Sequence, residues 1–217
     1  MTRVSAAVIF AAARLAAGGW AVERDAMKQW LLTVALATAL CGGAGATTVD
    51  GIRVANTAEV GGTQLVLNGA GLRTKFFFHV YVGALYLRTR TTDRVRALTD
   101  PGPKRLSMTL TRNLNAGQLI DALRQGIARN DSPAEQARIA PKVTAMIDLM
   151  RTFGEAKNGD LIAIDFLPDG TTRFSLNGRP EGAPIAGRNF QRGLLAVWLG
   201  GNPEQVTFQR ALLGRSD

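Results

Sequence analysis

The chain has 217 residues, of which 46% are hydrophobic and 6% aromatic, a composition typical of a globular protein with an ordinary core. Lys and Arg number 26 against 17 Asp and Glu, so the formal net charge is +9. The basic residues are scattered apart from one cluster without interleaved aromatic residues, which argues against nucleic-acid binding; the cluster consists of Arg88, Arg90, Arg94 and Arg96.

The N-terminal 46 residues have the features of a secretory signal. Met27 and Lys28 form a short basic start, and residues 31–40 form an apolar run of the expected length. Residues 44–46, Ala-Gly-Ala, supply the small residues that signal peptidase reads. We therefore expect cleavage after Ala46.

Residues 1–26, which precede this signal, are interpreted as an extension from a start codon assigned too early. The alternative is an N-terminal membrane anchor. Neither apolar run of this segment reaches the roughly 18 to 20 residues that a membrane span needs, so no stable span is expected. The sequence therefore predicts a periplasmic protein whose mature chain, residues 47–217, forms one domain.

Removal of the signal also removes Cys41, the only cysteine. The mature domain then has no thiol for a disulfide, a metal ligand or a nucleophile. Its one histidine, His79, lies on an apolar strand pattern, where a lone histidine is more often a packed residue than a catalytic one. Because there is also no HExxH motif, we expect no metal site and no cofactor.

Two short β patterns open the mature chain, at residues 47–54 and 60–67, and predict hairpins. A glycine bend is expected at Gly69 and Gly71. After it, a dense run of aromatic and β-branched residues predicts one long central strand that ends at Leu87.

Strand parity divides this central strand into two faces. The first face, which we expect to lie against the helices, consists of Phe76, Phe78, Val80, Val82, Ala84 and Tyr86. The second face, which we expect to look into a cleft, consists of Phe77, His79, Tyr81, Gly83, Leu85 and Leu87.

Two amphipathic helices follow in the middle of the chain. Asn115 is a candidate N-cap for a helix that ends near Asn130, and Pro133 is a candidate first residue for the next. Pro141 is expected to kink or split this second helix. Since each helix is apolar on one side only, both need a sheet to lie on, and this predicts an α+β fold.

The remaining elements complete the sheet and add helices at the C-terminus. They are a half-buried strand at residues 105–111, a hairpin of residues 160–167 and 171–176, and helices at residues 190–199 and 204–213.

Two stretches resemble the signature of the chalcone isomerase-like family. The first joins Asn68-Gly-Ala-Gly-Leu-Arg73 to VYVGALYL at residues 80–87, and the second is AVWLGGNP at residues 196–203. The similarity covers residues 47–214 and is strongest to the exported bacterial branch. It implies an open-faced β-sandwich, in which helices cover one face of an antiparallel sheet.

The resemblance also allows the catalytic positions of the true isomerases to be located. These enzymes use an arginine after the glycine bend, which Arg73 matches. Their threonine, tyrosine, asparagine and final serine or threonine correspond to Tyr81, Asn115, Ala122 and Val197 in this sequence. Each lost hydrogen-bond donor of a preorganised site removes on the order of 10² in rate, so chalcone isomerase activity is disfavoured.

What remains is a forked, permanently charged guanidinium beside an apolar cleft, which suits a carboxylate with an apolar tail. The resemblance implies the same, because the family includes noncatalytic members that bind fatty acids through this arginine and a tyrosine. The leading hypothesis is an exported noncatalytic protein that binds a fatty acid or another apolar carboxylate. Its candidate ligand-binding residues are Arg73, Tyr81, His79, Phe77 and Asn115.

Three alternatives stay open. The protein is an isomerase or intramolecular lyase of altered specificity, with Arg73 in the site and an acid or base nearby; or it is an interaction subunit of an envelope system, with an unknown protein partner. In the third, Arg73 is a structural ion-pair partner of a carboxylate such as Asp165. A shared ligand also requires a chain reversal or bulge, because eight residues of straight strand would separate Arg73 from Tyr81 by roughly 26 Å.

Overall fold

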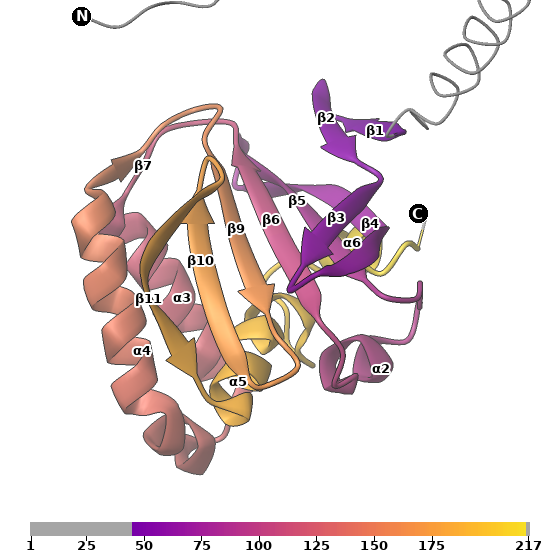
Figure 1. Cartoon of the computed structure of the whole chain (residues 1–217). Helices are drawn as coiled ribbons and strands as arrows, with labels where there is room; N and C mark the ends of the chain where they lie inside the picture. The colour runs from indigo at the N-terminus through magenta and orange to yellow at the C-terminus, as the bar shows by residue number, and fades with distance from the viewer. Residues whose placement is uncertain (1–44, 216–217) are drawn as a thin grey trace, which may run out of the picture. The chain divides into compact units, whose positions relative to one another are not determined.

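A seven-stranded antiparallel sheet forms the framework of residues 45–215, the part of the chain that the computed structural model describes (Figure 1). Its strands lie in the order β11-β10-β9-β6-β5-β4-β3. Their bounds are β3 Thr57–Val60, β4 Thr63–Lys75, β5 Phe78–Leu87, β6 Lys104–Leu110, β9 Leu161–Phe166, β10 Thr171–Leu176 and β11 Arg179–Ala186. The predicted signal lies outside the described residues except for Gly45 and Ala46.

Most of the predicted strands and hairpins are present. β1 (Ala46–Val49) and β2 (Ile52–Ala55) pair with each other, β3 pairs with β4, and β9 pairs with β10. The sequence pattern does not predict β11, because Pro180, Gly182 and Pro184 are residue types that strands avoid. β11 is an edge strand, where proline is tolerated since the outer side needs no ladder donor.

The predicted central strand is a hairpin, which corrects the expectation of one continuous strand. Phe76 and Phe77 form the turn between β4 and β5. Phe76 takes a φ of +55°, a conformation that tight turns usually assign to Gly or Asn, so no turn residue marks the reversal in the sequence. Arg73 consequently lies directly opposite Tyr81 in the strand register.

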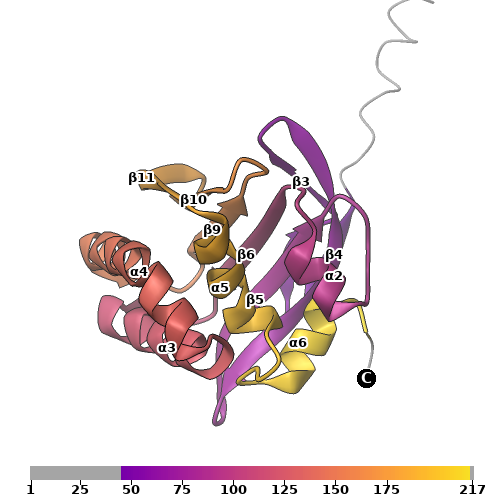
Figure 2. The same cartoon turned by 90° about the horizontal axis from the view of Figure 1, so that it is seen from below.

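The helices cover the face of β5 opposite to the one expected. Leu85 and Leu87 belong to the large core that the helices share, whereas Val82, Ala84 and Tyr86 belong to a smaller core behind the sheet, near β2 and β3. Both faces of the strand are apolar, so parity alone cannot decide which of them the helices cover. Figure 2 shows the helices together on one side of the sheet; they are α3 Ala116–Asn130, α4 Pro133–Phe153, α5 Arg188–Leu199 and α6 Val206–Leu212.

The two central helices begin as the sequence predicts. A capping box at Asn115 and Gln118 starts α3, and another at Ser132 and Glu135 starts α4. Pro141 neither splits nor ends α4, which runs unbroken through it. Pro141 is exposed, so the carbonyl that loses its intrahelical donor there can bond to water. A further short helix, α2 (Arg94–Thr99), occupies the segment expected to be a loop or a short helix.

The expected glycine bend is instead a path for α6 across the sheet. Gly69 and Gly71 lie inside β4, and Gly83 faces the same helix from β5. A Cβ atom at Gly69 would lie 2.1 Å from the carbonyl oxygen of Ala211, and one at Gly83 would lie 2.5 Å from the ring of Phe208. The glycines therefore let α6 approach the strands more closely than any side chain would allow.

We expect Gly69→Ala to lower the free energy of unfolding by about 1 to 3 kcal/mol, because the added methyl meets helix backbone that cannot move aside alone. The melting temperature should fall by about 2 to 4 °C for each kcal/mol. Gly201→Ala is the matched control, since its Cβ would meet nothing nearer than Arg94, at 4.0 Å. Equal melting temperatures for the two variants in calorimetry would contradict this packing role.

Candidate functional site

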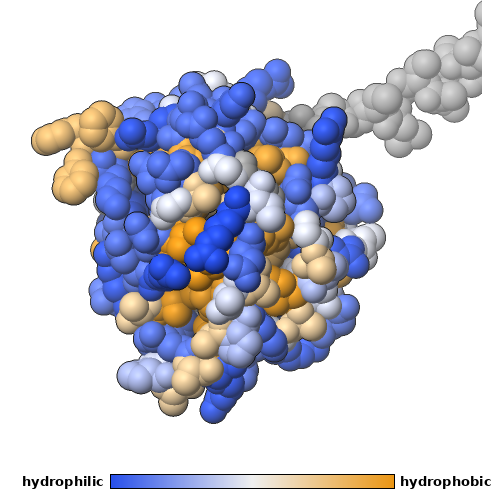
Figure 3. Space-filling model, turned by 90° about the vertical axis from the view of Figure 1, so that its left-hand side faces the viewer, coloured by the Kyte–Doolittle hydropathy of each residue, from blue (hydrophilic) through white to orange (hydrophobic). Residues whose placement is uncertain are grey.

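A cavity of about 350 Å³ lies between the helix-covered face of the sheet and α3, α4 and α5. Its interior wall is formed by apolar side chains, among them Met108, Leu119, Leu123, Met146, Met150, Ile162, Ile164, Phe174 and Leu176. On the side of the molecule that carries α4 and β11, apolar surface is visible among hydrophilic side chains (Figure 3). A cavity of this size and character suits a small molecule with a substantial apolar part.

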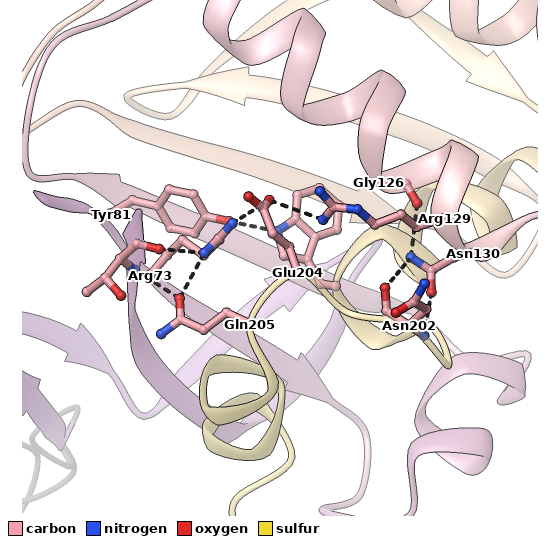
Figure 4. A network of polar contacts seen from close by, with 10 residues as sticks. Arg73, Tyr81, Gly126, Arg129, Asn130, Asn202, Glu204 and Gln205 are labelled. Atoms are coloured by element: carbon pink, nitrogen blue, oxygen red, sulfur yellow. Dashed lines mark hydrogen bonds and ion pairs between the residues drawn. The ribbon is translucent and has the colours of Figure 1, made fainter. Parts of the chain in front are cut away.

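Arg73 provides the positive charge in the wall of this cavity. It lies on β4 just before the turn, and only 12% of its side chain is exposed. Its guanidinium forms an ion pair with Glu204 and donates a hydrogen bond of 2.9 Å to the Oε1 atom of Gln205 (Figure 4). The backbone N–H of Thr74 donates to the same oxygen at 3.0 Å. The arginine is therefore held from the segment that leads into α6.

The loop between α5 and α6 positions Glu204 because it is fastened to the end of α3. The side chain of Asn130 donates to the carbonyl of Asn202 at 3.2 Å and accepts from its backbone N–H at 2.9 Å (Figure 4). Arg129, next to it on α3, has its Nη1 atom 3.7 Å from the Glu204 carboxylate. Glu204 thus lies between two arginines, and about a third of its side chain is exposed.

Tyr81 lies beside Arg73 on the neighbouring strand. Its hydroxyl accepts a hydrogen bond of 2.8 Å from the indole nitrogen of Trp198, and its ring packs edge-on against Phe208. Burial raises the pKa of the Tyr81 phenol, while the hydrogen bond from Trp198 and the charge of Arg73 oppose this shift. The phenol is therefore neutral at physiological pH, and its own hydrogen can be donated to an anion.

The turn between β4 and β5 contributes the rim of the cavity. Lys75, Phe76 and Phe78 line it from the turn, and Arg112 lines it from the loop after β6. The guanidinium of Arg112 lies 4.8 Å above the ring of Phe78. Two cations and two aromatic rings thus surround one end of the cavity.

The structure brings together two of the five candidate ligand-binding residues, Arg73 and Tyr81. Phe77 is 97% exposed at the tip of the turn and does not line the cavity. His79 is exposed and its Nδ1 atom lies 2.8 Å from Asp50, outside the cavity. Asn115 is exposed as the cap of α3. The hairpin separates Phe77 and His79 from the cavity, because the strand parity assumed for a continuous strand does not hold through the turn.

Asp165 is not the partner of Arg73. It accepts two hydrogen bonds from Arg105, at 2.5 and 2.7 Å, across the adjacent strands β6 and β9. Glu204, Gln205 and Trp198 are the site residues that sequence reasoning did not identify. Trp198 falls within the AVWLGGNP segment, which was the available signal, but no local pattern indicates that this segment reaches β4.

No group of three metal-ligating side chains is found within the described part of the chain. Across residues 45–215, no helix combines the length and the apolar character needed to cross a membrane.

Comparison with known proteins places these observations in a family. A family model described as chalcone isomerase-like matches residues 46–214. The chain belongs to the chalcone isomerase-like family. Its fold is similar to the crystal structure of a fatty-acid binding protein of Arabidopsis thaliana, with a TM-score of 0.62 and 11% sequence identity over 78% of this chain and 96% of that chain. A search of curated proteins gave no match.

Two positions that correspond to catalytic polar groups of the isomerases line the cavity as apolar residues. These are Ala122 and Val197, whereas Asn115 lies outside the cavity in its capping box. Near Arg73, the cavity wall therefore presents Tyr81 as its main neutral hydrogen-bond donor.

We expect the purified protein to convert a chalcone no faster than the uncatalysed reaction, because the groups that would hold and polarise this substrate are absent from these positions. Absorbance of the chalcone, followed with and without protein, measures this directly. The control is the same assay with Arg73→Ala. Turnover by the unchanged chain that this variant abolishes would mean that the cavity is an active site.

Proposed function

We propose that the protein is a noncatalytic carrier that holds a fatty acid or another apolar carboxylate in the cavity beside Arg73. The observation that carries this proposal is the placement of one largely buried guanidinium in the wall of an otherwise apolar cavity. A guanidinium presents two parallel N–H donors that match a carboxylate, and the apolar wall accommodates the tail. The neutral hydroxyl of Tyr81 supplies a further donor.

Glu204 acts in this proposal as a stand-in for the carboxylate of the ligand. It occupies Arg73 with the same chemical group that the ligand would present. When a ligand carboxylate binds Arg73, Glu204 moves to Arg129, whose Nη1 atom is already 3.7 Å away. The exchange leaves neither carboxylate without a cation, which avoids the cost of a desolvated and unpaired charge.

The similarity to a structure titled as a fatty-acid binding protein supports a carrier, because the shared fold is one that holds such a ligand. An isomerase of altered specificity would instead need an acid or base near Arg73. His79 and Asn115 lie outside the cavity, and the raised pKa of Tyr81 makes its phenolate a rare species at neutral pH. No described contact favours the enzyme over the carrier.

We also propose that the chain is exported to the periplasm and cut after Ala46. The support is the pattern of a basic start, an apolar run and small residues over residues 27–46.

Arg73→Ala should weaken the binding of a medium-chain fatty acid by at least about tenfold, since a buried charge-assisted contact contributes about 2 kcal/mol or more. Arg73→Lys should restore only part of the affinity, because an ammonium keeps the charge but not the fork. Tyr81→Phe should reduce the affinity less, by about 1 kcal/mol. Isothermal titration calorimetry measures all three, and Glu204→Gln should tighten binding because it removes the competing charge.

Arg105→Ala is the matched control, because Arg105 also forms an ion pair on this sheet but does not line the cavity. It should lower the melting temperature and leave the affinity unchanged. If Arg73→Ala behaves in the same way as this control, Arg73 is a structural ion-pair residue and the carboxylate site is wrong.

Chain recovered from the periplasmic fraction should begin at Thr47 when its N-terminus is sequenced. The control is a variant in which Ala44 and Ala46 are replaced by Asp, which should remain uncut. A chain that keeps Cys41, or that is found in the cytoplasm, would refute export by this signal.

A further inference from the structure

Three consecutive phenylalanines stand in solvent at the turn between β4 and β5. Phe76 is 85% exposed, Phe77 is 97% exposed and Phe78 is 58% exposed. The other exposed large apolar side chains of the described residues are single and scattered, at Val95, Leu161 and Val206. Exposed apolar surface is unfavourable in water, so a cluster of this kind marks an interaction surface.

The backbone of the turn keeps these rings away from the core. Phe76 has a φ of +55°, which is uncommon for a bulky residue and is found where function requires it. The hairpin projects from the body of the domain, as Figure 2 shows below α3 and α6. None of the three rings belongs to either hydrophobic core.

Cations lie at the base of this aromatic tip. Lys75 precedes the turn directly, and the guanidinium of Arg112 lies 4.8 Å above the ring of Phe78. Aromatic rings above a base of Lys and Arg are the arrangement that a bilayer surface favours, with rings among the acyl chains and cations among anionic headgroups. We propose that the tip formed by Phe76, Phe77 and Phe78 inserts into the surface of an anionic lipid bilayer.

The size of the tip favours a bilayer over a protein partner. Three phenylalanines present roughly 500 Å² of surface, taking about 150 to 200 Å² for each ring. A stable protein interface needs about 800 Å² from each partner. A bilayer has no such requirement, because a few aromatic side chains that reach the headgroup and acyl boundary are sufficient for reversible binding.

Insertion of the tip would place the cavity against the membrane. Lys75, Phe76 and Phe78 line both the base of the tip and the rim of the cavity. An acyl chain could then pass between the bilayer and the cavity without crossing water. This passage rests on the proposed function, whereas the insertion of the tip does not.

The insertion can be measured at the tip itself with an environment-sensitive fluorophore. Phe77 is the position for the label, because it does not line the cavity. The variant is Phe77→Cys in a full chain that also carries Cys41→Ser, so that NBD reacts at one site. With vesicles of phosphatidylcholine and phosphatidylglycerol, the emission of the label should rise and shift to the blue.

A label at Val95 is the matched control, because Val95 is 55% exposed on α2, which follows the opposite end of β5. Its emission should not shift, and binding of the chain through other residues would therefore not mimic insertion of the tip. Lys75→Gln and Arg112→Gln should each raise the lipid concentration at half-maximal signal about fivefold, as expected for one cation near an anionic surface. Phosphatidylcholine alone should give a weaker response.

An unchanged emission at position 77, or equal shifts at positions 77 and 95, would overturn the proposal, and so would a tip that responds to an added protein but to no vesicle. Arg73→Ala separates this inference from the proposed function. It should leave the signal at the tip unchanged while it lowers the affinity for a fatty acid in solution. Loss of only the second effect would refute the carboxylate site and leave the membrane tip standing.

Discussion

The reversal of the chain at Phe76 and Phe77 is the constraint on which the site depends. It pairs β4 with β5 so that Arg73 lies opposite Tyr81, and a single polar centre replaces two residues that a straight strand would hold far apart. The same reversal puts three aromatic rings at one end of the sheet, next to the rim of the cavity. Without it, neither a shared ligand nor an apolar tip would exist. A backbone conformation that Phe rarely adopts is therefore the origin of both features.

The second requirement is the close approach of α6 to these strands. Gly69 and Gly83 leave no side chain between the strands and the helix, so α6 settles directly on the sheet. The segment before α6 is thereby brought over Arg73, where Gln205 and Glu204 reach the guanidinium. The hydrogen bonds between Asn130 and Asn202 fix the other end of the same segment. Packing of small residues at one place in the sheet thus determines the electrostatics of the cavity.

Much of the fold could be predicted because its signals are local. The capping box at Asn115, Pro133 at the start of α4 and the hairpin of β9 and β10 are each encoded by a few neighbouring residues. The site could be predicted only in part. Arg73 and Tyr81 follow from a family resemblance, but the pairing of Arg73 with Glu204 joins residues far apart in the sequence, and no periodicity reports such a contact. The turn at Phe76 was missed for a different reason, since its conformation is imposed by the strands on either side and not by its own side chain.

The pair of Arg73 and Glu204 also explains how an apolar cavity can contain a cation before any ligand binds. A buried guanidinium without a partner would destabilise the fold strongly, so the chain supplies a carboxylate of its own. Binding is then an exchange of one carboxylate for another, in which the ionic contact with Arg73 nearly cancels. The net affinity must come from the apolar tail against the cavity wall and from the second contact that Glu204 gains with Arg129. A carboxylate without a tail has nothing to offset the displacement of Glu204, and the site therefore selects for long apolar acids even though its only charged anchor recognises any carboxylate.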